Sequence, residues 1–467
     1  MSRVPFNTLL QLISRGLELV SGLLVNAWLA RHWGSEAFGQ VGFYTSLAAV
    51  AACLFDLGLG TLLIRSIARD RARVRPYLAA ALRAIPPLAL LGTGLVVAVG
   101  WANDGATPIL LLLGLQLTCT ALSQVLRAAF YAFERMELES ATTALERGLW
   151  IVAGLYLASG APNPVMLFAA MALTRAAGVA LGAWLFLRKV APVAVDERPV
   201  ALLPLLAEAF PFGMNLGLTT LAASADVVML SFVAPEHDVG LYRAAGLVIM
   251  PLTLGAIAVN NALFPRMCAD REGLPATGDR AARLALAGAL PLAAFTAAYA
   301  PALVGLIFGA RFVEAAPILA LLAAVVPLRF LHNTLGTALS AGDRQPDRMR
   351  GAAIAAAVSV GLNLLLLPIL GAPGACLTAA ASDLAMVVVF HRALGSRAGL
   401  LRLGLWALPV SIALVAPLAV LGVPWWAAAA LIAVSYPPLL WLTGAYHPRE
   451  LRALIEERTS SDASLYA

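Results

Sequence analysis

Long apolar runs follow one another along the whole chain, separated by short polar connections. Most runs reach the roughly 20 residues that an α-helix needs to cross a bilayer. Their hydrophobicity is continuous rather than alternating with a period of two, which favours helices over the strands of a membrane barrel. The pattern therefore predicts an all-α polytopic membrane protein with about 14 transmembrane helices. The predicted spans are 9–30, 41–64, 78–100, 107–129, 144–160, 164–187, 204–233, 239–264, 283–308, 315–340, 351–370, 373–391, 403–422 and 425–444.

Arginine residues gather in every second connection between these runs. The arginine-rich connections are Arg65 to Arg75, Arg127 to Arg147, Arg188 to Arg198, Arg266 to Arg283, Arg344 to Arg350 and Arg392 to Arg402. Basic residues are retained on the cytoplasmic side during membrane insertion. We therefore expect a multi-pass protein of the inner or plasma membrane of the cell, with the N-terminus and the C-terminus both cytoplasmic.

Short motifs recur at matching places in the two halves of the chain. Phe38-Gly39 corresponds to Val239-Gly240, about 200 residues later, and a polar turn recurs at a similar spacing. Internal repeats of this kind are typical of transporters whose substrate site lies between the repeats. We predict an N-lobe of six helices, a cytoplasmic linker, a C-lobe of six helices, two further C-terminal helices and a cytoplasmic tail. Their predicted boundaries are 1–187, 188–203, 204–392, 393–446 and 447–467.

Composition leaves little room for a soluble domain. Of the 467 residues, 61% are hydrophobic and 12% are charged, whereas a soluble domain has about 25% charged residues. The net charge of +6 is explained by the arginine pattern and by attraction to anionic lipid, so we expect no nucleic-acid partner. The four cysteines form no CxxC motif and are predicted to be buried hydrophobes rather than metal ligands.

The sequence contains no motif of a known catalytic or nucleotide-binding site. Walker A, H-E-x-x-H and G-x-S-x-G patterns are absent. We therefore predict a protein that is not an enzyme, with no catalytic residue, no metal site and no cofactor.

Charged residues inside the predicted spans are the first candidates for function, because a charge at the bilayer centre costs roughly 2.5–3.5 kcal/mol on insertion scales. Arg15 and Glu18 are three residues apart on one helical face. They form either an internal ion pair or part of a cationic site for an anionic substrate. Arg329 and His332 share a face in a later span. A guanidinium matches phosphate oxygens bidentately, and His332 is either a proton relay or a satisfied core residue.

Other polar residues in the spans have two open interpretations. Asn215 and Asn260 are candidates for contacts with sugar hydroxyls, although hydrogen bonds between helices are the commoner use of such amides. Asp56 and Asp226 are carboxylates in apolar surroundings. Each is a candidate to bind a proton or a sodium ion that drives transport, or to pair with an arginine of a neighbouring span.

Three sets of short motifs resemble the polysaccharide transport family, which includes the O-antigen flippases. In the second half they are Asp226-Val227-Val228-Met229-Leu230, Val239-Gly240-Leu241-Tyr242-Arg243-Ala244-Ala245 and Leu263-Phe264-Pro265. In the first half they are Leu29-Ala30-Arg31, Phe38-Gly39 and Phe55-Asp56-Leu57-Gly58, and the third set is Asn363-Leu364-Leu365-Leu366-Leu367-Pro368 with Gly371, Gly374 and Ala375. This family belongs to the multidrug, oligosaccharidyl-lipid and polysaccharide exporter superfamily. The resemblance implies two six-helix lobes around a central cavity, alternating access and a lipid-pyrophosphate-linked glycan as substrate.

The leading hypothesis is a flippase that moves undecaprenyl-pyrophosphate-linked oligosaccharide from the cytoplasmic to the outer leaflet, with H⁺ or Na⁺ as a possible coupling ion. A lipid II flippase is an alternative, because the resemblance implies for those members fourteen spans and cationic cavity residues on spans 1, 2 and 8. This chain matches them in part, with Arg15 on span 1 and Arg65 and Arg243 at span ends. A drug or cation antiporter on the same scaffold would favour a cavity rich in carboxylates and aromatic residues. A membrane assembly subunit without transport would show extended interaction loops. Gene neighbours that encode glycosyltransferases would support the leading hypothesis.

Overall fold

The computed structural model describes residues 4–103, 106–191, 196, 198–253, 255–256, 260, 263–264, 267–268, 273–395 and 399–442. Throughout these ranges every regular element is a helix. The described helices cover each of the fourteen predicted spans at least in part. The predicted all-α membrane class is therefore confirmed, whereas the predicted tail at 447–467 lies outside the described residues.

Length and hydropathy identify the helices that are able to cross a membrane. Among the described residues, eight helices pass both criteria, or nine if the bent pair Ala310–Leu322 and Val325–Ala341 is one span. Two shorter apolar helices, Ala407–Val420 and Trp425–Leu439, follow near the C-terminus. Ile13–Arg69 is one of these eight helices, although it covers most of the first two predicted spans. The number of helices is therefore smaller than the number of spans that they cover.

The chain divides into two compact units. The first contains Met1–Ala244, Ile307–Phe312 and Ser359–Ala375, and the second contains Ala245–Leu306, Val313–Val358 and Cys376–Ala467. Both units are therefore built from more than one segment of the chain. The predicted lobe boundaries at 187 and 204 stay a prediction.

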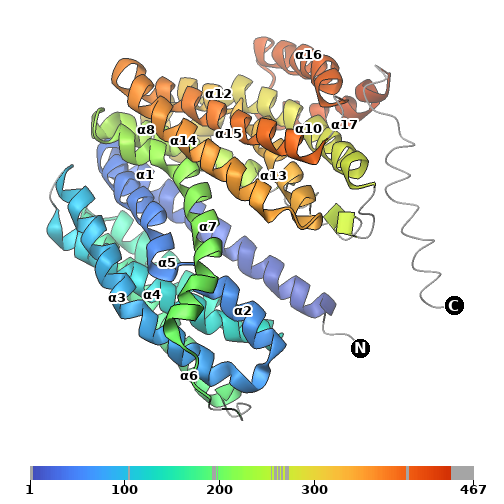
Figure 1. The fold of residues 1–467 in the computed structure, drawn as a ribbon. Coiled ribbons are helices and arrows are strands. Elements are labelled where there is room, and N and C mark those ends of the chain that lie inside the picture. The colour runs from blue at the N-terminus through green and yellow to red at the C-terminus, as the bar shows by residue number, and fades with distance from the viewer. Residues whose placement is uncertain are drawn as a thin grey trace. The chain divides into compact units, whose positions relative to one another are not determined.

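The helices of the first unit form a bundle, drawn from blue to green in Figure 1. They are α1 (Val4–Asp56), α2 (Leu59–Arg69), the short η1 (Arg71–Arg73), α3 (Val74–Trp101), α4 (Thr107–Ala132), α5 (Met136–Ala158), α6 (Pro164–Lys189) and α7 (Leu202–Leu230), followed by the start of α8 (Glu236–Leu252). Within this bundle α1 packs against α5 and α7, and α4 packs against α6 and α3. Helix α1 therefore has a side that faces α5, and this side positions the site described below.

The second unit is also helical. It contains α10 (Leu274–Ala298), α12 (Ala316–Leu322), α13 (Val325–Ala341), α16 (Gly399–Val420) and α17 (Trp425–Leu442), together with most of α15 (Ala372–Leu394). Helices α11 (Ala300–Phe308) and α14 (Gln345–Leu370) and the short η3 (Ala310–Ala315) each contribute residues to both units. Helix α10 packs against α13 and α16, and α16 packs against α17.

Two glycine positions explain how the first unit bends and packs. Gly34 adopts φ 81° and kinks α1, and a second break follows Asp56, where Leu57 and Gly58 have φ 45° and 81°. A Cβ on Gly58 would lie 2.4 Å from the backbone nitrogen of Gly213 in α7. Only glycine allows both this left-handed backbone and this close approach.

The repeated motifs of the sequence meet in space. A Cβ on Gly39 would lie 1.9 Å from the carbonyl oxygen of Glu236 and 2.9 Å from the nitrogen of Gly240. Ser35 and His237, four and three residues earlier, are joined by a hydrogen bond of 2.6 Å. The two Gly-containing motifs therefore pack backbone against backbone inside the first unit.

Candidate functional site

Seven charged side chains gather between four helices of the first unit. We call them the arginine–glutamate cluster, and they are Arg15 and Glu18 of α1, Arg127 of α4, Glu139, Glu146 and Arg147 of α5, and Arg175 of α6. Glu146 lies near the middle of α5 and Arg175 near the middle of α6. The cluster thus places charge well inside the helical bundle rather than at its ends.

Glu146 is the centre of this cluster. Its Oε2 accepts a hydrogen bond of 3.1 Å from Arg127 Nη2. Its Oε1 lies 2.5 Å from Arg175 Nη1 and 3.7 Å from Arg147 Nε. On the side of α6 there is room for this carboxylate because residue 178 is glycine, whose Cβ would lie 3.3 Å from Glu146 Oε2. One carboxylate therefore holds guanidinium groups from three helices.

The other two glutamates extend the cluster toward α1. Glu139 Oε1 accepts the Thr143 hydroxyl at 2.9 Å and lies 3.7 Å from Arg127 Nη1. Glu18 Oε1 lies 3.5 Å from Arg147 Nη2 and 3.9 Å from Arg127 Nη1, and its Oε2 accepts from Arg15 Nη1 at 3.3 Å. The Arg15–Glu18 ion pair of the sequence analysis is thus the outermost part of a larger network.

Burial and charge decide what this network can do. The side chains of Glu146, Glu139 and Arg127 are only 3%, 5% and 9% exposed, whereas Arg15 is 77% exposed. Four arginines face three glutamates, which leaves one positive charge in excess. Among the described residues, Arg127 Nε and Glu139 Oε2 are buried without a hydrogen-bond partner. The buried Arg127 N–H needs an acceptor and the buried Glu139 oxygen needs a donor, from water or from a ligand. The positive charge in excess makes the cluster suited to a polar, anionic ligand.

The structure corrects one expectation about this region. The predicted spans 107–129 and 144–160 leave residues 130–143 as a connection, but only Phe133–Arg135 separate α4 from α5. Across helix interfaces, Arg127 of α4 is paired with Glu139 and Glu146 of α5, and Arg147 of α5 is paired with Glu18 of α1. The same charges lower the hydropathy of α5, which is why its first turns were not recognised as part of a span.

A second, smaller group lies in the second unit. Asp383 of α15 accepts a hydrogen bond from Arg329 Nε through Oδ2 at 3.2 Å, and its Oδ1 lies 3.3 Å from His332 Nε2. We call these three residues the Asp383 trio. Their side chains are 15–27% exposed. The structure thus brings together the two predicted residues of α13 and adds a carboxylate that the sequence analysis did not single out.

The two predicted coupling carboxylates occupy different settings in the first unit. Asp56 ends α1, and its Oδ1 accepts a hydrogen bond of 3.1 Å from the Gly60 backbone nitrogen in the first turn of α2. Asp226 is buried in α7, where its Oδ2 accepts the hydroxyl of Tyr242 from α8. Arg243, next to Tyr242, donates to the hydroxyl of Ser46 at 3.1 Å. Asp56 therefore caps a helix break, and Asp226 connects α7 to α8; their role in coupling stays a prediction.

The two predicted amides lie apart from these groups in sequence and environment. Asn215 is half-buried in α7, and its backbone carbonyl oxygen accepts the Thr219 hydroxyl at 2.9 Å. Asn260 is buried, and no donor among the described residues reaches its Oδ1. Their predicted contacts with sugar remain a prediction.

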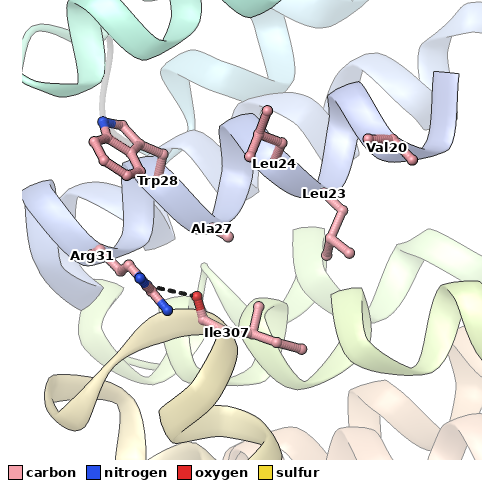
Figure 2. A pocket seen from close by; sticks show the side chains of 7 residues that line it. All are labelled: Val20, Leu23, Leu24, Ala27, Trp28, Arg31 and Ile307. Atoms are coloured by element: carbon pink, nitrogen blue, oxygen red, sulfur yellow. Dashed lines mark hydrogen bonds between the residues drawn. The ribbon is translucent and has the colours of Figure 1, made fainter. Parts of the chain in front are cut away.

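An open groove follows α1 toward the kink at Gly34. It encloses about 380 Å³ and is lined by Val20, Leu23, Leu24, Ala27, Trp28, Arg31 and Ile307. Figure 2 shows that Arg31 reaches from α1 to Ile307, whose carbonyl oxygen accepts from Arg31 Nε at 2.9 Å. Trp28 donates its indole N–H to Ser159 Oγ at 3.0 Å. The groove is aliphatic along most of its length and has a polar end.

Comparison with protein families identifies the class of this helical membrane protein. A family model described as polysaccharide biosynthesis protein matches residues 4–269, and the model of the lipid II flippase MurJ matches residues 193–444. Each covers more than half of the chain. Together they define an exporter of the multidrug, oligosaccharidyl-lipid and polysaccharide superfamily, whose members are transporters rather than enzymes. The chain belongs to the polysaccharide biosynthesis protein family within it, and its second half also fits the MurJ model.

Solved structures show the same fold. The lipid II flippase MurJ in an inward closed conformation is 12% identical, with a TM-score of 0.73, over 94% of this chain and 98% of that one. An inward-facing multidrug resistance MATE family transporter is 16% identical, with a TM-score of 0.62, over 80% and 94%. A superfamily transporter from Pyrococcus furiosus with a binding pocket of reversed polarity is 16% identical, with a TM-score of 0.60, over 83% and 95%. A search of curated protein sequences finds no match.

Proposed function

We propose that this protein is a flippase that moves a lipid-pyrophosphate-linked oligosaccharide from the cytoplasmic to the outer leaflet by alternating access. The substrate's carrier would be undecaprenyl pyrophosphate, and the membrane would be the inner or plasma membrane, with both termini in the cytoplasm. The barrier to this reaction is the transfer of a charged, hydrated head group through hydrocarbon.

The arginine–glutamate cluster is the observation that carries this proposal. Buried ionic networks are no more stable than well-packed apolar residues of the same volume, so packing does not explain seven charges inside one bundle. Charged residues kept within spans generally mark the substrate or ion path. An excess of one guanidinium suits a pyrophosphate, because arginine binds phosphate oxygens through paired hydrogen bonds. Arg15, the exposed member, would meet the head group first, with Glu18 holding its side chain.

The remaining predicted residues have places in the same scheme. Arg329 and His332 would also bind the head group, which would compete with Asp383 for them. Asn215 and Asn260 would contact sugar hydroxyls. Asp56 or Asp226 would take up the coupling H⁺ or Na⁺, because the sequence has no nucleotide-binding motif to drive transport. The two lobes would then rock about the bound head group while the lipid chain stays in the bilayer.

Lipid II is the second candidate substrate. The MurJ family model over residues 193–444 and the MurJ fold over 94% of the chain favour it. Lipid II also carries a pyrophosphate, so the cluster suits both substrates. A drug or cation antiporter is disfavoured, because an arginine excess repels cationic drugs.

The decisive experiment measures flipping by the purified protein in liposomes. Fluorescent undecaprenyl-pyrophosphate oligosaccharide and fluorescent lipid II are incorporated in parallel, and the label in the outer leaflet is quenched chemically over time. We expect fast flipping of the oligosaccharide and slow flipping of lipid II. Faster flipping of lipid II would move the assignment to the second candidate. Rates equal to protein-free liposomes for both lipids, under every ion gradient, would contradict the proposal and favour a non-transporting assembly subunit.

A further inference from the structure

The proposed substrate is an amphiphile, and helix α1 has two chemically different sides. Arg15 and Glu18 lie on the side that faces α5, where Ser14 donates to Ser140 at 2.9 Å. At about 100° per residue, the nine positions from Arg15 to Leu24 turn the helix by about 180°. Leu24 therefore points away from the arginine–glutamate cluster, onto the side that carries the groove.

The groove side of α1 is an exposed aliphatic stripe. Val20 is 58% exposed and Leu24 is 41% exposed, and Ile13, two turns earlier on the same side, is 57% exposed. Their spacing of seven and four residues keeps them on one face. Between Val20 and Arg31 this face is hollowed into the groove of about 380 Å³, whose lining side chains are drawn in Figure 2. Hydrocarbon is the ligand that such a lining favours.

One position between the two sides of α1 carries no side chain. Gly16 is exposed, and a Cβ added there would meet nothing within 4 Å. It directly follows Arg15, and it precedes Leu23 by seven residues, which places it on the edge of the groove face. A molecule whose charged end contacts Arg15 would therefore meet no side chain at residue 16 as its chain runs toward Val20.

From this division we propose that the groove along α1 binds the isoprenoid chain of the lipid carrier. This inference rests on the proposed function and adds the site of the chain to that of the head group. The arginines of the cluster favour the chain of an anionic carrier over the chain of a bulk phospholipid as the occupant of the groove. Only the carrier's chain is tethered to a pyrophosphate that binds at the cluster. Helix α1 would thus separate head group from chain while the head group crosses the membrane.

Filling the groove tests the inference. Ala27 is half-buried and lines the groove, so Ala27→Phe places a ring where the chain would lie. The affinity of purified protein in nanodiscs is measured for one pyrophosphate-linked glycan carried on a long undecaprenyl chain and on a short geranyl chain. We expect wild-type protein to prefer the long chain, and Ala27→Phe to weaken it by about tenfold, the equivalent of roughly two buried methylene groups. The affinity for the short chain should not change.

A matched control is available on α3, where Ala98 is exposed and Ala98→Phe should change neither affinity. If Ala27→Phe does not fold, Ala27→Leu should reduce the preference for the long chain by a smaller factor. A wild-type protein with no preference for the long chain, or an Ala27→Phe variant that keeps the full preference, contradicts the assignment of the groove to the chain. Neither result contradicts the proposed function. Wild-type protein that binds neither lipid contradicts the proposed function, and the groove assignment with it.

Discussion

The arginine–glutamate cluster and the Asp383 trio differ in how their charge is set. In the cluster, four arginines outnumber three glutamates, and arginine does not lose its proton in proteins. Its positive excess is therefore permanent as long as the glutamates are ionised. In the trio, one carboxylate contacts Arg329 and His332, so the charge of Arg329 is balanced by that of Asp383. The first unit thus offers an excess of positive charge, whereas the trio of the second unit offers a guanidinium that already has a counter-charge.

Removal of the central carboxylate should have the largest effect. Glu146→Gln leaves Arg127, Arg147 and Arg175 without their shared buried counter-charge. Breaking a buried pair in this way costs about 3–5 kcal/mol of the free energy of unfolding, so we expect a large drop in the thermal midpoint of the purified protein. Glu134→Gln is the matched control, because Glu134 is 68% exposed in its ion pair with Arg71 and such pairs contribute at most about 1 kcal/mol. Equal midpoints for the two variants would show that the cluster is not a structural network.

Arg15 should affect transport without affecting stability, because its side chain is mostly exposed. Arg15→Ala should reduce glycan export by roughly ten- to a hundredfold at unchanged protein level, the size of a lost charge-assisted hydrogen bond. Arg15→Lys should recover only part of it, since lysine keeps the charge but not the paired donors. Arg198→Ala, at a residue 86% exposed beside Asp196, is the control. Full export by Arg15→Ala and by Arg329→Ala would remove both residues from the substrate site.

Substitution of Asp226 should have the smallest effect on flipping, and the effect should be confined to its ion dependence. Asp226→Asn imitates a protonated carboxyl, so the H⁺ or Na⁺ dependence of flipping should be lost while flipping itself continues. Tyr242→Phe removes the hydroxyl that Asp226 accepts but keeps the carboxylate, and should retain the ion dependence. Reduced stability of Asp226→Asn with intact ion dependence would mean that Asp226 only connects α7 to α8.

Much of the fold was predictable, because hydrophobic runs of about 20 residues report membrane helices directly. The prediction of helices was least accurate at α5. Its first turn carries Glu137 and Glu139, so the start of the helix resembles a polar connection although it is helical and partly buried. Spacing offered a signal: Glu139 and Glu146 are seven residues apart and share one helical face, which is unexpected in a loop.

The candidate site was only partly predictable for the same reason. Neighbours within one helix, such as Arg15 and Glu18 or Arg329 and His332, follow from spacing. Contacts between helices do not: nothing in the sequence joins Arg175 to Glu146, or Asp383 to Arg329. Asp383 was overlooked because it is a single carboxylate in an apolar run, and only tertiary packing shows that it contacts two residues of α13.

The central claim is that a permanent excess of arginine recognises the pyrophosphate of the substrate. The most direct test compares the affinity of the purified protein for a short-chain pyrophosphate-linked glycan with that for the same glycan and chain on an uncharged linker. We expect the pyrophosphate to bind at least about tenfold more tightly in the wild type. This advantage should be lost when Arg15→Ala and Arg147→Gln are combined. Equal affinities in the wild type, or an advantage that survives in the double variant, would contradict the claim.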